Sequence, residues 1–230
     1  MKNLVIVGGG VAGLSAGIFA LKNGFNVTIY EKNSYVGGNL TGWVRDGLEI
    51  DGCIHWLTGT NKLTKTYKKW VEVGALENTS IIKKDTLFTS YYNGQKVSLY
   101  RDTKKTLLEM IYLSKQDKKE IISFIKAVEK FKLIMGVGGE FNNKKASIFD
   151  LFSFLPYLIK YYKLNLQDLA NKFNNKAIKN LFTNFIGGCF SSLAMIITYA
   201  TFSSGNGDLP KGGSKQMATK MQNKFLSLGG

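Results

Sequence analysis

Short apolar runs and a helical repeat alternate over the first part of the chain. The apolar run of residues 4–7 predicts a short buried strand over residues 3–7, and the glycines at 8–10 turn the chain. Between residues 11 and 23, apolar side chains recur every three or four positions, which predicts a helix that Gly24 ends. A second apolar strand is expected over residues 25–30. The pattern therefore predicts strand, glycine turn, helix and strand in close succession.

A pattern typical of antiparallel strands lies further along. Residues 86–92 and 95–100 flank Asn93 and Gly94. Asn-Gly is well suited to the left-handed backbone angles of a two-residue hairpin turn. We therefore expect an antiparallel hairpin over these residues.

Helical patterns dominate the middle of the chain. Ser114 and Asp117 predict an N-terminal cap. Five apolar residues then share one helical face: Ile121, Ile122, Ile125, Val128 and Phe131. Residues 149–162 are dense in aromatic and aliphatic side chains, and Pro156 is expected to bend or interrupt this stretch. The stretch could line a tunnel for an apolar substrate, touch a membrane, or form an ordinary helical core.

The long apolar stretch at residues 181–202 has to be compared with a membrane span. It contains Asn184, paired glycines at 187–188 and several Ser and Thr residues. A spanning helix needs about twenty predominantly apolar residues. A buried helix is therefore the preferred interpretation. A later glycine pair at 212–213 marks a turn.

Composition and charge narrow the classes of partner. Apolar residues make up 44% of the 230-residue chain, which is typical of a globular protein, and the net charge is +15. Arg45 and Arg101 are the only arginines, whereas nucleic-acid readers depend on arginine forks, so we expect no nucleic-acid partner. From Phe141 onward, eleven Lys stand against three Asp, a local charge of +8. This excess favours contact with an anionic surface such as a membrane as a minor hypothesis.

Cysteine and histidine are scarce. Cys53 and Cys189 lie far apart without a C-x-x-C partner, so we expect small buried thiols in a reduced, cytoplasmic compartment. His55 is the only histidine, which leaves no His cluster for a metal and no triad without it. No metal site is predicted, and the oligomeric state cannot be inferred.

The glycine turn carries the sharpest chemical signal. Gly8, Gly10 and Gly13 fill the pattern G-x-G-x-x-G, with Val11 and Ala12 opening the helix. The first glycine permits the tight turn, the second lets a pyrophosphate approach the backbone, and the third lets the helix pack on the strand. The helix N-terminus then offers free N–H groups to the phosphates. The turn predicts a dinucleotide site.

An acidic residue completes this site. Glu31 ends the second predicted strand, eighteen residues after Gly13. A carboxylate there can accept hydrogen bonds from both ribose hydroxyls of an adenosine, and it disfavours the 2′-phosphate of NADP. These residues alone do not choose between FAD and NAD.

Three further segments carry a resemblance to flavin enzymes. Residues 31–38, Glu-Lys-Asn-Ser-Tyr-Val-Gly-Gly, resemble the segment after the second strand in flavin amine oxidases and carotenoid desaturases. Residues 47–56 resemble the Gly-x-x-x-Asp-x-Gly stretch of the phytoene desaturase branch, and residues 209–213 resemble its Pro-x-Gly-Gly before a helix. Weaker similarity runs through residues 91–102 and 113–117. The chain therefore resembles the N-terminal portion of a phytoene desaturase-like, FAD-dependent oxidoreductase.

The resemblance implies a fold and a function. It implies an α/β, Rossmann-like dinucleotide domain of the glutathione-reductase type, made of residues 1–80 and 203–230. Residues 81–202 would form an inserted hairpin-plus-helical substrate domain, with the substrate pocket where the two domains meet. The implied reaction is FAD-dependent desaturation or isomerisation of an apolar, polyene or carotenoid-like substrate. The alternatives are a flavin amine oxidase, an NAD-linked oxidoreductase of similar fold, and an inactive N-terminal fragment.

Motif and resemblance together assign the cofactor site. The expected FAD-binding residues are Gly8, Gly10, Val11, Ala12, Gly13, Glu31, Lys32, Gly37, Gly38, Asn39, Leu40, Gly52 and His55. The resemblance places His55 near the flavin, while Asp51 is expected to have a structural role; no catalytic residue is assigned because the flavin would carry the redox chemistry.

Two features depart from the family pattern. The family usually has arginine directly after the paired glycines, where this chain has Asn39. Asparagine keeps hydrogen bonding but loses the charge, so weaker flavin affinity is one expected consequence. The sequence also stops at Gly229–Gly230, where the family continues into another strand. The resemblance thus predicts further cofactor-binding segments beyond these residues.

Overall fold

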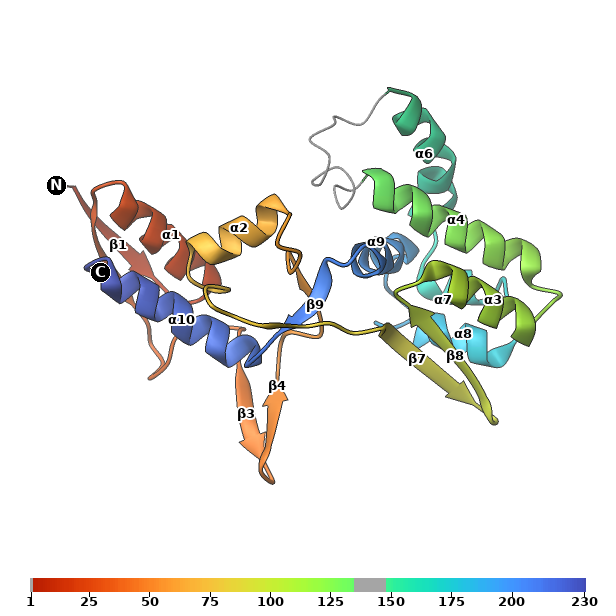
Figure 1. Cartoon of the computed structure of the whole chain (residues 1–230), viewed down its shortest axis with the longest axis horizontal. Helices are drawn as coiled ribbons and strands as arrows, with labels where there is room; N and C mark the ends of the chain where they lie inside the picture. The colour runs from red at the N-terminus through yellow and green to blue at the C-terminus, as the bar shows by residue number, and fades with distance from the viewer. Residues whose placement is uncertain (1, 135–147) are drawn as a thin grey trace. The chain divides into compact units, whose positions relative to one another are not determined.

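The computed structural model describes residues 2–134 and 148–230, which divide into two compact units (Figure 1). The first unit comprises Met1–Lys83 and Asp208–Gly230, and the second comprises Lys84–Gly207. Each unit is described by itself below. The assignment of the first unit to FAD and of the second to the substrate stays a prediction.

The first unit begins with the predicted βαβ element. Strand β1 (Asn3–Val7) pairs in parallel with β2 (Asn26–Tyr30), and helix α1 (Val11–Lys22) connects them. Leu14 and Ile18 are buried on the inner side of α1. The parallel pairing requires a crossover connection, which α1 supplies. The order of elements expected from the sequence is confirmed.

The expected burial of β1 is wrong. Leu4 and Ile6 pack against the apolar cluster of this unit, but Val5 is 62% and Val7 88% exposed. On β2, Tyr30 is 63% exposed and lies opposite Val7. Alternate residues of a strand face opposite sides of its sheet, so one side of this two-stranded sheet is open among the described residues. Parallel sheets are normally covered on both faces.

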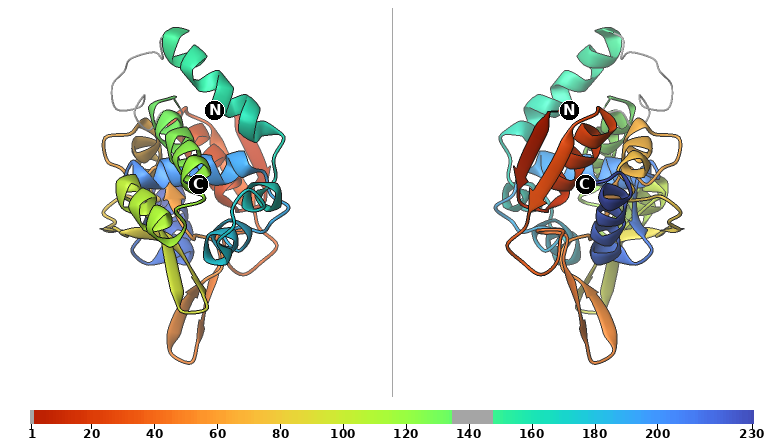
Figure 2. Two further views of the ribbon diagram at one scale, coloured as in Figure 1. Left: turned by 90° about the vertical axis from the view of Figure 1, so that its right-hand side faces the viewer. Right: turned by 90° about the vertical axis from the view of Figure 1, so that its left-hand side faces the viewer.

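Two helices and a hairpin complete most of the first unit. The hairpin joins β3 (Gly42–Arg45) to β4 (Leu48–Asp51) in antiparallel register. Helix α10 (Gly213–Ser227) packs beside it, helix α2 (Lys65–Glu72) is joined to α1 by the Lys22–Glu72 ion pair, and Figure 2 shows α1 and α10 next to each other. Gly17 of α1 permits this contact, because a Cβ there would lie 2.8 Å from the ring of Phe225.

A small sheet joins distant parts of the chain within this unit. Strand β9 (Gly207–Pro210) lies between β5 (Leu57–Thr58) and β6 (Ile81–Ile82). It pairs with β6 in antiparallel register, with Ile81 opposite Pro210. Strand β9 thereby brings the glycine pair of residues 212–213 back to the first unit.

The second unit contains the predicted hairpin. Strands β7 (Thr86–Tyr92) and β8 (Gln95–Tyr100) have the expected bounds. Asn93 and Gly94 have φ angles of 45° and 73°, the left-handed pair that a type I′ turn needs. The hairpin and its turn are confirmed.

Six described helices accompany this hairpin. They are α3 (Thr103–Leu113), α4 (Lys118–Ile134), α6 (Ile148–Tyr162), α7 (Leu166–Ala170), α8 (Lys176–Thr183) and α9 (Ser192–Ser203). Their core is aromatic: Phe124 packs edge-to-face on Phe182 at 5.1 Å between ring centroids and stacks with Tyr199 at 6.2 Å. On α4, Phe124 is fully buried whereas Ile122 is only half-buried, so the predicted face is rotated slightly.

The structure bears on three other expectations. Pro156 lies inside α6 without interrupting it. The apolar stretch at 181–202 is not one helix, since α8 ends at Thr183 and α9 begins at Ser192. The Asp117 carboxylate accepts hydrogen bonds from the backbone N–H groups of Asn174 and Asn175, tying a distant turn to the start of α4. Among the described helices, none combines the length and apolarity needed to cross a bilayer.

Candidate dinucleotide site

The glycine turn between β1 and α1 has the geometry that a phosphate cradle needs. Gly8 has a φ of +101°, and its N–H donates to the carbonyl of Tyr30 at 2.8 Å. A side chain at Gly13 would collide with the carbonyl oxygen of Gly8. Gly10 is the N-cap of α1 and supplies no side chain to cap it. The first-turn N–H groups of α1 therefore face the turn without a capping side chain from Gly10.

The space in front of Gly10 is open. A Cβ at Gly10 would lie 3.8 Å from both the carbonyl oxygen of Gly37 and the Cα of Gly38, which is ordinary contact. The packing of the protein itself therefore does not require glycine at this position. The bare backbone leaves room for a group to approach it, and a helix N-terminus favours an anionic one.

Glu31 lies directly behind the turn. Its Oε2 accepts the N–H of Gly9 at 2.7 Å, and its Oε1 accepts the N–H of Asn33 at 2.9 Å. These donors, Asn33 first and Gly9 next, hold the pKa of the Glu31 carboxyl below its usual value. The group is therefore ionised at neutral pH. The Asn33 side-chain amide also donates to Oε1 at 2.9 Å. A carboxylate has about four acceptor positions, so capacity remains for about one further donor such as a ribose hydroxyl.

The paired glycines lie against the same turn. Gly37 donates its N–H to the carbonyl of Gly9 at 2.8 Å, and its φ of +120° favours glycine. A Cβ on Gly37 would lie 2.9 Å from the Cβ of Ala218 on α10, and one on Gly38 would lie 3.3 Å from the Cα of Gly10. The segment after β2 is thus held between the glycine turn and α10.

Neighbours of these glycines differ in exposure. Leu40 is buried, whereas Lys32 and Asn39 are exposed. Val36 contacts the turn, since a Cβ at Gly9 would lie 3.1 Å from its Cγ1. Val36 is not recognisable from the sequence as part of this turn, because an apolar residue in a loop carries no chemical signal of its own.

Asp51 fixes the start of α10. Its Oδ2 accepts the N–H of Ser214 at 2.7 Å, and its Oδ1 accepts the Ser214 hydroxyl at 2.6 Å and the N–H of Ile54 at 2.8 Å. Desolvation raises the pKa of the Asp51 carboxyl, but the hydrogen bonds from Ser214, Cys53 and Ile54 outweigh it and lower the pKa below the usual value. Asp51 is thus a charged cap on a helix N-terminus, a structural role.

The contact between the Asp51 carboxylate and the start of α10 requires the glycine pair before this helix. Gly212 and Gly213 have φ angles of 84° and 58°, in the left-handed region. A side chain on Gly213 would collide with the carboxylate of Asp51. The Pro-x-Gly-Gly signal was visible in the sequence, but its partner Asp51 was not identifiable from local spacing.

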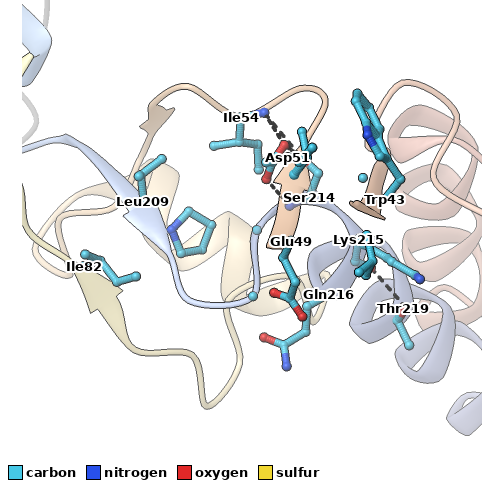
Figure 3. Close-up of a pocket in the computed structure, with 16 residues that line it drawn as sticks. Trp43, Glu49, Asp51, Ile54, Ile82, Leu209, Ser214, Lys215, Gln216 and Thr219 are labelled. Carbon is cyan, nitrogen blue, oxygen red and sulfur yellow. Dashed lines mark hydrogen bonds between the residues drawn. The ribbon is translucent and has the colours of Figure 1, made fainter. Parts of the chain in front are cut away.

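A pocket of about 490 Å³ lies between the β3–β4 hairpin and the start of α10 (Figure 3). Its walls mix apolar side chains, among them Trp43, Leu209 and Pro210, with polar ones such as Lys215. Figure 3 shows the side chains of Glu49 and Gln216 on the same side of this pocket. The pocket therefore combines partly apolar walls with a carboxylate, an ammonium group and an amide.

Some predicted residues stand apart from the turn. His55 is exposed, and its described ring neighbour is Trp56 at 6.3 Å between centroids. Gly52 is exposed and packs beside Trp43. The structure brings together the glycine turn, Glu31 and the paired glycines, but it shows no contact of His55 or Gly52 with that turn among the described residues.

The expectation that the cysteines are buried is wrong. Cys53 and Cys189 are both free and exposed. Cys53 follows Asp51 in the turn that this carboxylate organises, and Cys189 lies in the turn between α8 and α9. Both positions are surface turns, where a small residue need not be buried.

Comparison with known proteins agrees with this geometry. Residues 6–70 match the family described as NAD(P)-binding Rossmann-like domain. The chain is 26% identical over 196 residues to a 4,4'-diaponeurosporene oxygenase of Staphylococcus aureus, covering 80% of this chain and 38% of that protein. It is 27% identical over 135 residues to the protein of the same name from Staphylococcus haemolyticus, covering 56% of this chain and 26% of the relative.

Solved structures share the fold. A putrescine oxidase triple mutant gives a TM-score of 0.56 at 17% identity, covering 99% of this chain and 49% of that one. An oxidoreductase from Methanosarcina mazei gives a TM-score of 0.51 at 18% identity, covering 100% of this chain and 50% of that one. The chain thus spans about half the length of these structures and less of the sequence relatives. It is an α/β protein with an NAD(P)-binding Rossmann-like domain at residues 6–70, similar in sequence to 4,4'-diaponeurosporene oxygenases.

Proposed function

We propose that the first unit binds FAD and that the chain is the cofactor-holding part of an FAD-dependent oxidoreductase. The observation that carries this proposal is the bare backbone at Gly10, which faces the uncapped start of α1 with the ionised Glu31 behind it. In this arrangement the N–H groups of α1 would hold the pyrophosphate, and Glu31 would accept a hydrogen bond from the adenosine ribose.

The choice of FAD over other dinucleotides rests on two supports. The carboxylate of Glu31 would repel the 2′-phosphate of NADP. The similarity to diaponeurosporene oxygenases and the resemblance of residues 31–38 to flavin enzymes favour a flavin over nicotinamide. A bound flavin would supply the hydride acceptor, and the residues of this chain would bind it and position it.

The proposed substrate is apolar, of the polyene or carotenoid class. The relatives are named for a carotenoid-type compound, and apolar side chains form part of the walls of the pocket beside α10. Apolar lining with a few polar groups is typical of small-molecule sites. Glu49 and Gln216 would then position one end of the substrate.

Ligand competition tests the cofactor assignment. The purified chain is titrated with FAD, FMN and NADP⁺, with binding followed by flavin fluorescence or calorimetry. We expect FAD to bind, FMN to bind more weakly because it lacks the adenosine that Glu31 recognises, and NADP⁺ to bind least well. Equal affinities for FMN and FAD would contradict the assignment of Glu31.

A second assay separates the substrate classes. The FAD-loaded protein is offered a polyene and, separately, a diamine, with flavin bleaching recorded anaerobically. Bleaching by the polyene supports the proposal. Bleaching by the diamine alone would place the protein among amine oxidases.

A further inference from the structure

The carboxylate of Glu31 is held by hydrogen bonds from two sides. Its Oε2 accepts the backbone N–H of Gly9 at 2.7 Å. Its Oε1 accepts two hydrogen bonds from Asn33, one from the backbone N–H and one from the side-chain amide, both at 2.9 Å. Donors on both oxygens fix the rotation of the carboxylate group, so its orientation is set by the protein alone.

The two oxygens of this carboxylate differ in the capacity they have left. Each carboxylate oxygen offers about two acceptor positions. Asn33 uses both positions of Oε1, whereas Oε2 keeps one beside the N–H of Gly9. A Cβ on Gly9 would lie 3.4 Å from Oε2, so glycine leaves this oxygen less crowded than any other residue would. With respect to the described residues, the free acceptor position of Glu31 is therefore on Oε2.

This oxygen is the one tied to the glycine turn. Gly9 lies between two glycines of the motif and directly precedes Gly10, the N-cap of α1. A donor that reaches Oε2 would thus lie beside the turn that we assign to the pyrophosphate. Asn33, in contrast, is exposed in the segment that follows β2, and its side-chain amide closes off Oε1.

We propose that Glu31 binds one hydroxyl of the adenosine ribose, through Oε2, and that Asn33 limits it to one. The inference rests on the proposed FAD site and makes its selectivity specific. A carboxylate at the end of the second strand can in general accept both ribose hydroxyls. Here the amide of Asn33 occupies the position that a second hydroxyl would need. Asn33 is therefore a positioning residue, which acts on the cofactor through Glu31.

FAD analogues that lack either the 2′ or the 3′ hydroxyl of the adenosine test this selectivity. Binding to the whole chain is followed by the change in flavin fluorescence. We expect one analogue to bind about tenfold more weakly than FAD, because one charged hydrogen bond is lost, and the other to bind about as well as FAD. If FAD binds but both analogues lose equally, or neither loses, the proposal is overturned and the FAD site stands. A chain that binds no FAD would contradict the proposed function and this inference together.

The variant Asn33→Ala tests the positioning role. It frees a position on Oε1, so the analogue that the unaltered chain binds like FAD should now bind more weakly than FAD. Loss of the amide donor should also raise the pKa of the Glu31 carboxyl toward its usual value, so FAD affinity should begin to fall at a higher pH. The matched control is Asn26→Ala. It removes the hydrogen bond from the Asn26 amide to Asn3 at the opposite end of the same two strands and should change neither property.

Circular dichroism checks that both variants are folded. A folded Asn33→Ala protein that keeps either the analogue selectivity or the pH profile of the unaltered chain would overturn the role given to Asn33. Equal changes in the Asn26→Ala control would overturn it as well, because they would show a general effect of the lost amide.

Discussion

Replacing either of two glycines of the same motif by alanine is predicted to damage a different property of the protein: cofactor binding at Gly10 and stability at Gly13. At Gly10, a Cβ meets nothing closer than 3.8 Å, and the extended φ of −75° suits any residue. Gly10→Ala should therefore lower the free energy of unfolding by less than about 1 kcal/mol, the scale of an N-cap change. At Gly13, a Cβ collides with the carbonyl oxygen of Gly8. Gly13→Ala should cost roughly 1–3 kcal/mol, as overpacking does.

The two substitutions should also weaken FAD binding for different reasons, directly at Gly10 and only through the fold at Gly13. The alanine methyl at Gly10 fills the space assigned to the pyrophosphate and removes charged hydrogen bonds worth about 1.5–3 kcal/mol each. Losing two such hydrogen bonds at the lower end of this range removes roughly 3 kcal/mol of binding free energy. FAD binding should then weaken about a hundredfold. Gly13→Ala should lose affinity only in proportion to lost folding.

Urea denaturation and FAD titration on both variants check this pair. The expected result is a stable Gly10→Ala protein that binds FAD about a hundredfold more weakly and a Gly13→Ala protein that is less stable. A Gly10→Ala protein with unaltered FAD affinity would refute the position given to the pyrophosphate. A Gly13→Ala protein of unaltered stability would refute the helix–strand contact.

Three further predictions concern charge and packing. Glu31→Gln should weaken FAD binding roughly tenfold by removing a charged acceptor, and affinity of the unaltered chain should fall below pH 4.5 as the lowered pKa of Glu31 is crossed; a flat pH profile in calorimetry would count against it. Asp51→Asn should cost about 1–3 kcal/mol of unfolding free energy at pH 7, while the exposed Asp46→Asn should cost almost nothing. Because the folded pKa of Asp51 lies below 3.8, this difference should be present above that pH and disappear below it in denaturation curves. Phe124→Ala should lower stability by about 3–5 kcal/mol, and a loss under 1 kcal/mol would show that the aromatic core is misplaced.

Local signals explain the features that sequence reasoning predicted well. The strands at 86–92 and 95–100 follow from Asn93–Gly94, whose turn geometry sets the register of both strands. The glycine turn and α1 follow equally from spacing within a few residues. In each case the determining contacts are short in sequence.

Long-range contacts explain most of the failures. Asp51 and Ser214 are 163 residues apart, so no local pattern could show that one caps the helix of the other. The burial expected for β1 depended on what covers the second side of the sheet, and its own apolar residues say nothing about that cover. The surface positions of Cys53 and Cys189 depend likewise on the turns that hold them.

Binding of FAD by the first unit is tested by the absorption spectrum of the chain purified without added cofactor. We expect flavin bands, or their appearance when FAD is added, and FAD as the compound released on denaturation. A folded chain that stays colourless and binds no added FAD would contradict it.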